Sequence, residues 1–269
     1  SAERPASDEI GVVWIGDDYA ISATKWDGTT LDSGSEPAAA FATDVARGTA
    51  GSPNTGYQES YGITFETTSG DLLVFYGVEG DTFLELRGRP SGSAWTISDS
   101  LNVGREIGSM SVASSPISDK VSIGEYFSGG GHASFIYWSG SAFSHTSDGS
   151  STAAAVDGEN AIGTTWLVDG ANEVAIYTYN DADASGINID WASSTNGGAP
   201  SVQADVSAAP NTDALDRFHK LVSNPINPAE ALFFVESENA DIVVKRAVLT
   251  GTTVNWTSVE PGATFLELN

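Results

Sequence analysis

Residues 180–190, with the sequence NDADASGINID, show the spacing of oxygen-bearing side chains that comes nearest to a metal site. Aspartate and serine occupy alternate positions, and Gly186 follows where a calcium loop needs a sharp bend. The candidate ligands are Asp181, Asp183, Ser185 and Asp190. The match is partial, because Asn188 and Ala192 stand where an EF-hand loop has an aliphatic residue and a glutamate. Two interpretations therefore stay open, a calcium site and a solvated hairpin tip.

Acidic side chains in or beside the predicted strands point to a second chemistry, glycoside hydrolysis. That reaction needs two carboxyl groups about 5 to 9.5 Å apart, one protonated and one ionised. The candidates are Glu66, Asp71, Glu125, Glu173 and Glu236. No local motif selects a pair among them. The sequence motifs of serine hydrolases, zinc proteases and phosphate-binding loops are missing.

Aromatic residues offer a third chemistry, stacking against a ligand. Most of the seven tryptophans recur at matching places in a repeat, a pattern typical of core packing. Tyr137 and Trp138 directly precede the turn sequence Ser-Gly-Ser-Ala, so we expect them to be the most exposed aromatic pair. The predicted ligand-binding residues are Tyr137, Trp138 and Glu125.

The composition restricts the partners of the chain. Its 269 residues include 11 basic and 36 acidic ones, which gives a net charge of −25. Such a field repels nucleic acid and anionic membranes, so we expect neither as a partner. No cysteine is present, which excludes disulfides, and no apolar run of about 20 residues predicts membrane insertion. The start SAERPASDEI fits a secreted chain after signal-peptide removal, and equally an engineered chain start.

Short apolar runs such as GVVWI, LLVFY and VAIYTY, punctuated by Gly, Asp, Asn and Ser, indicate an all-β fold. The runs group into units that each hold a tight glycine turn. The turn glycines are Gly28, Gly92, Gly140, Gly186 and Gly251. This repeat predicts one β-propeller domain over residues 1–269, built from five four-stranded blades, with six blades as the alternative. In this scheme residues 180–190 connect the outer two strands of the fourth blade.

The first unit lacks its innermost strand, and the C-terminal run ATFLEL, residues 263–268, is predicted to supply it. The predicted blades span residues 9–35 with 263–268, 60–100, 107–147, 160–195 and 216–258. Closing a propeller from both termini protects an otherwise open edge. The same strand can pair with another molecule, which makes self-assembly an open alternative.

The hairpin sequences Trp-Asp-Gly at residues 26–28 and Trp-Ser-Gly at residues 138–140 resemble those of fucose-binding β-propeller lectins. The resemblance covers the outer hairpins of the units. It implies a propeller fold and a sugar held by an arginine in the preceding strand and a glutamate just ahead of Trp-Asp-Gly. Here the strand VVWIG has no arginine and the run SATK has no glutamate, so that sugar site is not carried over.

These observations favour a non-catalytic module, extracellular or on the cell surface, that mediates adhesion or binds a glycan or a protein. Recognition is expected at the mouth of the funnel or at the hairpin rim. One alternative is a glycoside-active enzyme with carboxylates in the central funnel. Another is a structural subunit of a surface layer or filament. Calcium, as the candidate cofactor, would brace the enlarged tip of the fourth blade.

Overall fold

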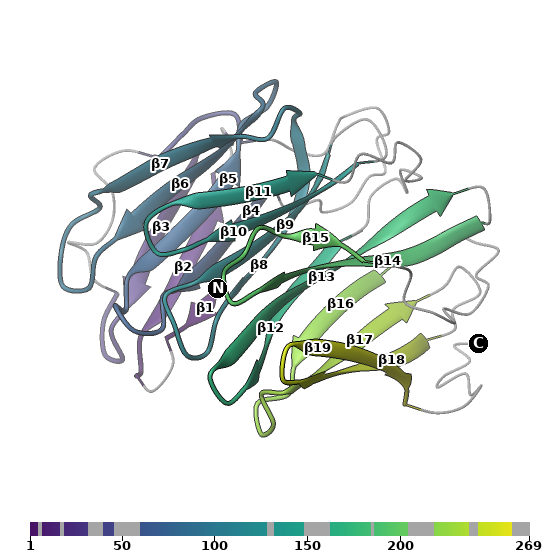
Figure 1. Ribbon diagram of the computed structural model, residues 1–269. Coiled ribbons are helices and arrows are strands. Elements are labelled where there is room, and N and C mark those ends of the chain that lie inside the picture. The colour runs from purple at the N-terminus through teal and green to yellow at the C-terminus, as the bar shows by residue number, and fades with distance from the viewer. Residues whose placement is uncertain are drawn as a thin grey trace.

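The computed structural model consists of β-strands joined by turns and loops (Figure 1). It describes residues 1–4, 7–16, 19–31, 40–45, 60–127, 132–147, 162–183, 186–203, 218–236 and 242–259. Those residues form nineteen strands and no helix, which confirms the all-β prediction. Accordingly, no helix in the described ranges is long and apolar enough to span a membrane. β-Branched and aromatic side chains dominate the strands because they pack well on a pleated surface.

The strands form five antiparallel sheets, each built from strands that are consecutive in the described chain. Sheet 1 contains β1 (Ala2–Glu3), β2 (Ile10–Ile15) and β3 (Ile21–Trp26). Sheet 2 contains β4 (Tyr61–Phe65), β5 (Leu72–Gly77), β6 (Phe83–Arg89) and β7 (Ile97–Asn102). Sheet 3 contains β8 (Ile107–Ser114), β9 (Val121–Phe127), β10 (Ala133–Trp138) and β11 (Phe143–Ser147).

The last two sheets continue this pattern toward the C-terminus. Sheet 4 contains β12 (Ile162–Asp169), β13 (Asn172–Asp183), β14 (Gly186–Thr195) and β15 (Ser201–Val202). Sheet 5 contains β16 (Phe218–Ser223), β17 (Glu230–Glu236), β18 (Ile242–Thr250) and β19 (Thr253–Ser258). Figure 1 shows the sheets following one another from the purple sheet 1 to the yellow end of sheet 5.

The hydrophobic core is divided among the junctions between consecutive sheets. Ile21 and Ala23 of sheet 1 share one apolar cluster with Val74 and Tyr76 of sheet 2. Three further clusters join sheets 2 and 3, sheets 3 and 4, and sheets 4 and 5. Among the residues that the structure describes, no such cluster joins sheet 5 to sheet 1. Each sheet is therefore stabilised mainly by its neighbours in the chain.

All five sheets contribute to one central cavity of about 230 Å³. Lining residues from sheets 1 to 5 include Val13, Tyr61, Ser111, Gly163 and Lys220. In sheets 2 to 5 these residues lie on the first strand, so the sheets radiate from a common axis, as the propeller prediction requires. Gly62 lets β4 approach β8, because a Cβ atom there would lie 2.2 Å from Val112 Cγ2.

Sheet 1 departs from the prediction at both of its edges. The short strand β1 pairs with β2 on the inner side, through Ala2 and Gly11, where the sequence predicts residues 263–268. Residues 263–268 lie outside the described residues, so their role in closure stays a prediction. On the outer side, isolated bridges from Leu31 and Ala42 to β3 stand in place of a paired fourth strand.

The prediction for residues 180–190 was wrong about their place in sheet 4. They connect the second and third strands, because β13 and β14 pair from Val174↔Thr195 to Asp183↔Gly186. The outer hairpin turns instead at Asn196 and Gly197, whose φ angles are 50° and 82°, and leads into β15. The sequence alone favours Gly186 as the outer turn because it does not show that β14 runs for ten residues before turning.

Candidate functional site

Each sheet has a hairpin rim, the end at which its first strand connects to its second and its third strand leads into the outer turn. In sheets 1 to 3 the described rim residues are 4, 7–9, 27–30, 66–71, 90–96, 115–120 and 139–142. Positive φ angles at Gly28, Gly92 and Gly140 allow the tight outer turns, which glycine adopts without steric cost. Hydrogen bonds link the rims of neighbouring sheets, such as that from the Thr68 amide to Asp119 (2.6 Å). Turns that are distant in sequence therefore meet at this end of the molecule.

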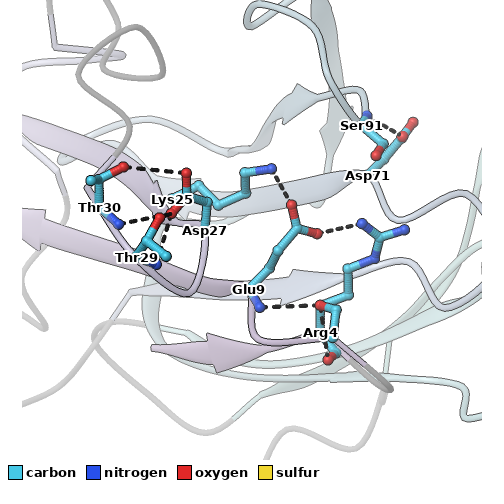
Figure 2. Close-up of polar contacts among 9 residues, drawn as sticks. Arg4, Glu9, Lys25, Asp27, Thr29, Thr30, Asp71 and Ser91 are labelled. Carbon is cyan, nitrogen blue, oxygen red and sulfur yellow. Dashed lines mark hydrogen bonds and ion pairs between the residues drawn. The ribbon is translucent and has the colours of Figure 1, made fainter.

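Three charged residues form what we call the rim cluster of sheet 1: Arg4, Glu9 and Lys25 (Figure 2). The Glu9 carboxylate lies between the two cations and accepts from Arg4 Nη1 on Oε2 and from Lys25 Nζ on Oε1. The side chains are 25%, 17% and 12% exposed, respectively. Burial alone would raise the pKa of Glu9, but hydrogen bonds from Lys25 and Arg4 hold it below its ordinary value. The cluster is thus a fixed, partly accessible arrangement of one anion between two cations.

The neighbouring sheet shapes the space around the rim cluster. The Arg4 guanidinium lies against Gly70, where a Cβ atom would be 2.1 Å from Arg4 Nη2. Gly70 also has a φ of +74°, so a side chain at this position would be strained as well as blocked. Next to it, Asp71 Oδ1 accepts the Ser91 amide at 2.9 Å and fixes the outer hairpin of sheet 2 (Figure 2).

Asp27 fixes the Trp-Asp-Gly hairpin that follows Lys25 (Figure 2). Its Oδ1 accepts the amides of Thr30 (2.8 Å) and Thr29 (2.9 Å) and the Thr29 hydroxyl (2.8 Å). These bonds, led by the one from the Thr30 amide, hold the pKa of Asp27 well below its ordinary value. The aspartate of this hairpin therefore serves to order the turn, and it leaves Lys25 in a defined position beside it.

A buried carboxylate links the rims of sheets 2 and 3. Glu66 accepts the Trp138 indole N–H on Oε1 (2.8 Å) and the Ser69 hydroxyl on Oε2 (2.7 Å). Asp119 accepts two backbone amides from the same turn of sheet 2, those of Thr68 and Ser69. Burial raises the pKa of Glu66 and outweighs these two hydrogen bonds to its side chain.

A second buried carboxylate links the rims of sheets 3 and 4. Glu173 accepts the hydroxyls of Ser115 (2.7 Å) and Ser118 (2.8 Å) on Oε2 and forms an ion pair with Lys120. Burial acts to raise the pKa of Glu173, but the Lys120 ammonium and the two hydroxyls lower it overall. Burial also raises the pKa of the adjacent Tyr137 to about 12, helped by the Glu173 charge.

The expectation that Tyr137 and Trp138 are exposed was wrong. Each side chain is only 4% exposed. Tyr137 packs near Trp166, with ring centroids 6.3 Å apart, and Trp138 packs on Phe143 at 4.8 Å. Both residues still lie on β10, and the turn begins only at residue 139, so the pleat and sheet twist direct their rings into the two junctions of sheet 3.

Glu125, the third predicted ligand-binding residue, is fully buried on β9. It stands opposite Met110 and Ser134 in the strand register. Its two carboxyl oxygens have no hydrogen-bond partner in the parts of the chain that the structure describes. Burial raises its pKa well above the ordinary value. The position of Glu125 gives it no access to a surface ligand.

Most carboxylates that the sequence offers for glycoside hydrolysis already accept hydrogen bonds from protein groups. This holds for Glu66, Asp71 and Glu173. Glu125 lies in the core, and the side chain of Glu236 is outside the described ones. Glu66, Asp71 and Glu173 thus stabilise turns and sheet junctions.

The structure does not test the calcium prediction. Asp181 and Asp183 lie on β13 and Asp190 on β14, but the side chains of residues 180–189 are outside the described ones, as is all of Ser185. Among the described residues, no three His, Asp or Glu side chains form a cluster suited to a metal ion. Calcium binding at this hairpin stays a prediction.

Sequence reasoning missed the rim cluster. In the sequence Lys25 only occupies the place of the lectin glutamate, and no motif marks Arg4 or Glu9. One signal was available: basic residues are scarce in this chain, and two of the 11, Arg4 and Lys25, stand on either side of Glu9 in the sequence. Only the pairing of β2 with both β1 and β3, which sets Gly11 opposite Ala2 on one side and Lys25 on the other, brings the three side chains together.

Comparisons with solved structures identify the architecture. The BP39L lectin from Burkholderia pseudomallei superposes with a TM-score of 0.55 and 12% identity, over 98% of this chain and 69% of that chain. The SapL1 lectin, solved in complex with alpha methyl fucoside, superposes with a TM-score of 0.52 and 14% identity, over 97% of this chain and 80% of that chain. AofleA from Arthrobotrys oligospora superposes with a TM-score of 0.51 and 11% identity, over 97% of this chain and 72% of that chain.

This likeness confirms, for the fold, the resemblance to β-propeller lectins that the hairpin sequences predict. At 11–14% identity it establishes the fold alone. No protein-family model and no curated protein sequence matches the chain.

Proposed function

We propose that the protein is a glycan-binding module that recognises a saccharide at the rim cluster of sheet 1. The observation that carries the proposal is the arrangement of Arg4, Glu9 and Lys25 on a fold shared with lectins. The lectin pattern needs an arginine in the strand before the hairpin and a glutamate just ahead of Trp-Asp-Gly. Here Glu9 precedes β2 and Lys25 precedes Trp-Asp-Gly, so the two charges have exchanged places.

The chemistry of the rim cluster suits sugar hydroxyl groups. A carboxylate has about four lone-pair sites, and Arg4 and Lys25 each occupy one on Glu9. A guanidinium group has five N–H donors, of which Arg4 directs one toward Glu9. One hydroxyl can thus donate to Glu9 while its neighbour on the sugar ring accepts from Arg4. Because the ion pairs already hold both groups in place, little side-chain entropy is lost on binding.

A glycan array followed by calorimetric titration tests the proposal, with methyl-α-L-fucoside as the first single-sugar probe. We expect the parent protein to bind and Glu9→Gln and Lys25→Met to lose binding. The matched controls are Glu79→Gln and Arg246→Met, which change the same charges at exposed positions away from the rim cluster and should bind like the parent. Binding by neither parent nor controls, or equal binding by all variants, would refute the proposal.

We also propose that the five sheets are the five blades of the propeller and that residues 263–268 complete the first blade. We propose further that the protein acts outside the cell or at its surface. The shared central cavity and the four junctions between consecutive sheets support the blade count. Self-assembly through the terminal strand is the competing use of residues 263–268. Light scattering distinguishes the two, since closure within one molecule gives a monomer.

A further inference from the structure

The central cavity contains a charged side chain that has no role in the rim cluster. Lys220, on β16, lines the cavity and is exposed. Its ammonium group has no ion-pair or hydrogen-bond partner among the described residues. In contrast, Lys25 and Lys120 each form an ion pair with a glutamate. A lysine without a partner in the described part of the chain is notable where 36 residues are acidic and 11 basic.

Beside Ser1 and several apolar side chains, the cavity wall supplies neutral hydrogen-bonding groups. The strands β4, β8, β12 and β16 are edge strands of their sheets, and edge strands present backbone N–H and C=O groups that are not used in the sheet. Gly62 and Gly163 lie on this wall without side chains to cover the backbone. Ser111 lines it too, and its Oγ accepts the Thr164 amide at 3.2 Å, which leaves its O–H free to donate.

The size of the cavity selects small ligands. Its volume of about 230 Å³ lies below the roughly 300 to 1,000 Å³ of typical small-molecule sites. It holds several water molecules at about 30 Å³ each, so a small ion or one small molecule fits, but an oligosaccharide does not. A cation that has no partner among the described residues, with neutral donors on the same wall, favours an anion in such a space.

We propose that the central cavity binds a small oxyanion, a carboxylate or a sulfate group, through Lys220. The anion supplies the partner that the lysine does not have among the described residues, and the O–H of Ser111 and the backbone amides of the edge strands complete the hydrogen bonds of the anion. An inorganic sulfate and the carboxylate of an acidic monosaccharide share this chemistry. The site is separate from the rim cluster, so the two proposals stand or fall independently.

The test is a titration followed by amide NMR, at constant ionic strength adjusted with sodium chloride. The probes are sodium sulfate, sodium glucuronate and neutral glucose, and the reporters are the amides of Gly62 and Gly163. We expect saturable shifts with an anionic probe and none with glucose. Shifts with both anions identify a general oxyanion site, and shifts with glucuronate alone identify an acidic sugar as the ligand. Either result supports the proposal.

Variants separate the lysine from its surroundings. Lys220→Met should weaken anion binding at least about tenfold, as expected for loss of a hydrogen bond to a charged group. Arg246→Met removes a charge from an exposed position of the same sheet and should bind like the parent, as should Glu9→Gln. The proposal is overturned if no anion shifts the two glycine amides, if glucose shifts them equally, or if Lys220→Met retains the parent affinity.

Discussion

Replacing Glu125 with methionine should make the protein more stable. The Glu125 carboxyl group is fully buried, and neither of its oxygens has a hydrogen-bond partner in the described part of the chain. A buried polar group without a partner costs about 1 to 3 kcal/mol of stability, and methionine is close to glutamate in volume and adapts to its surroundings. We therefore expect the free energy of unfolding to rise by about 1 to 3 kcal/mol. For a chain of this size that corresponds to an increase in Tm of roughly 2 to 12 °C.

The gain should depend on pH in a defined direction. Burial raises the pKa of Glu125 well above its ordinary value of 4.5. As pH rises above that ordinary value, the unfolded chain releases its proton while the folded protein keeps it, so the parent loses stability until pH passes the folded pKa. The slope attributable to this residue is at most about 1.4 kcal/mol per pH unit. Glu125→Gln should remove this slope, while Glu125→Met should also remove the cost of the unpaired polar group.

The assay is calorimetric unfolding of the parent and both variants at several pH values between 4 and 8. The matched control is Glu173→Met, which removes a buried carboxylate that has partners. Breaking a buried ion pair costs about 3 kcal/mol or more, so the control should unfold at a lower temperature than the parent. A Glu125→Met protein that is less stable than the parent at pH 7, or a gain that shrinks as pH rises, would refute the reasoning.

Three further predictions concern the junctions and the closure of the fold. Gly62→Val should lower the urea midpoint of unfolding, because the new Cβ atom would lie 2.2 Å from Val112 Cγ2 on β8. The loss of stability should be about 1 to 3 kcal/mol, the usual cost of overpacking. An unchanged midpoint would contradict the close approach of β4 to β8. Trp138→Phe should lower the free energy of unfolding by about 1 to 3 kcal/mol, because it leaves a Glu66 oxygen unpaired. The control Trp256→Phe should lower it less in the same thermal unfolding assay, because the indole N–H of Trp256 has no partner among the described residues. Deleting residues 263–269 should lower the Tm strongly if they close the first blade, and an unchanged Tm would rule that closure out.

The strands of sheets 2, 3 and 5 could be predicted from the sequence because their signal is local. Alternation over five to eight residues and a glycine turn are visible without knowledge of the partner strand. Sheet 4 shows the limit of this signal. Gly186 and Gly197 are equally plausible turns in the sequence, and only the ten-residue pairing of β13 with β14 decides between them.

The candidate site could not be predicted in the same way, because it depends on the register between strands. Lys25 reaches Glu9 only because β3 returns beside β2 with Gly11 opposite Lys25. Arg4 is held by the neighbouring sheet at Gly70, 66 positions further along the chain. Trp138 likewise finds its hydrogen-bond partner, Glu66, at the rim of another sheet. Such contacts leave no periodic trace in the sequence.

The carboxylates at the sheet junctions have a consequence for how this fold can change in evolution. Glu66, Asp119 and Glu173, together with Asp169, which accepts the Gly251 amide at 2.7 Å, each connect one sheet only to the next. Stability then approximates a sum of contributions from adjacent units, as in linear repeat proteins. Duplication of one unit copies a complete junction with it, so a gene encoding this chain can gain a sheet without new contacts having to arise at the other junctions between consecutive sheets.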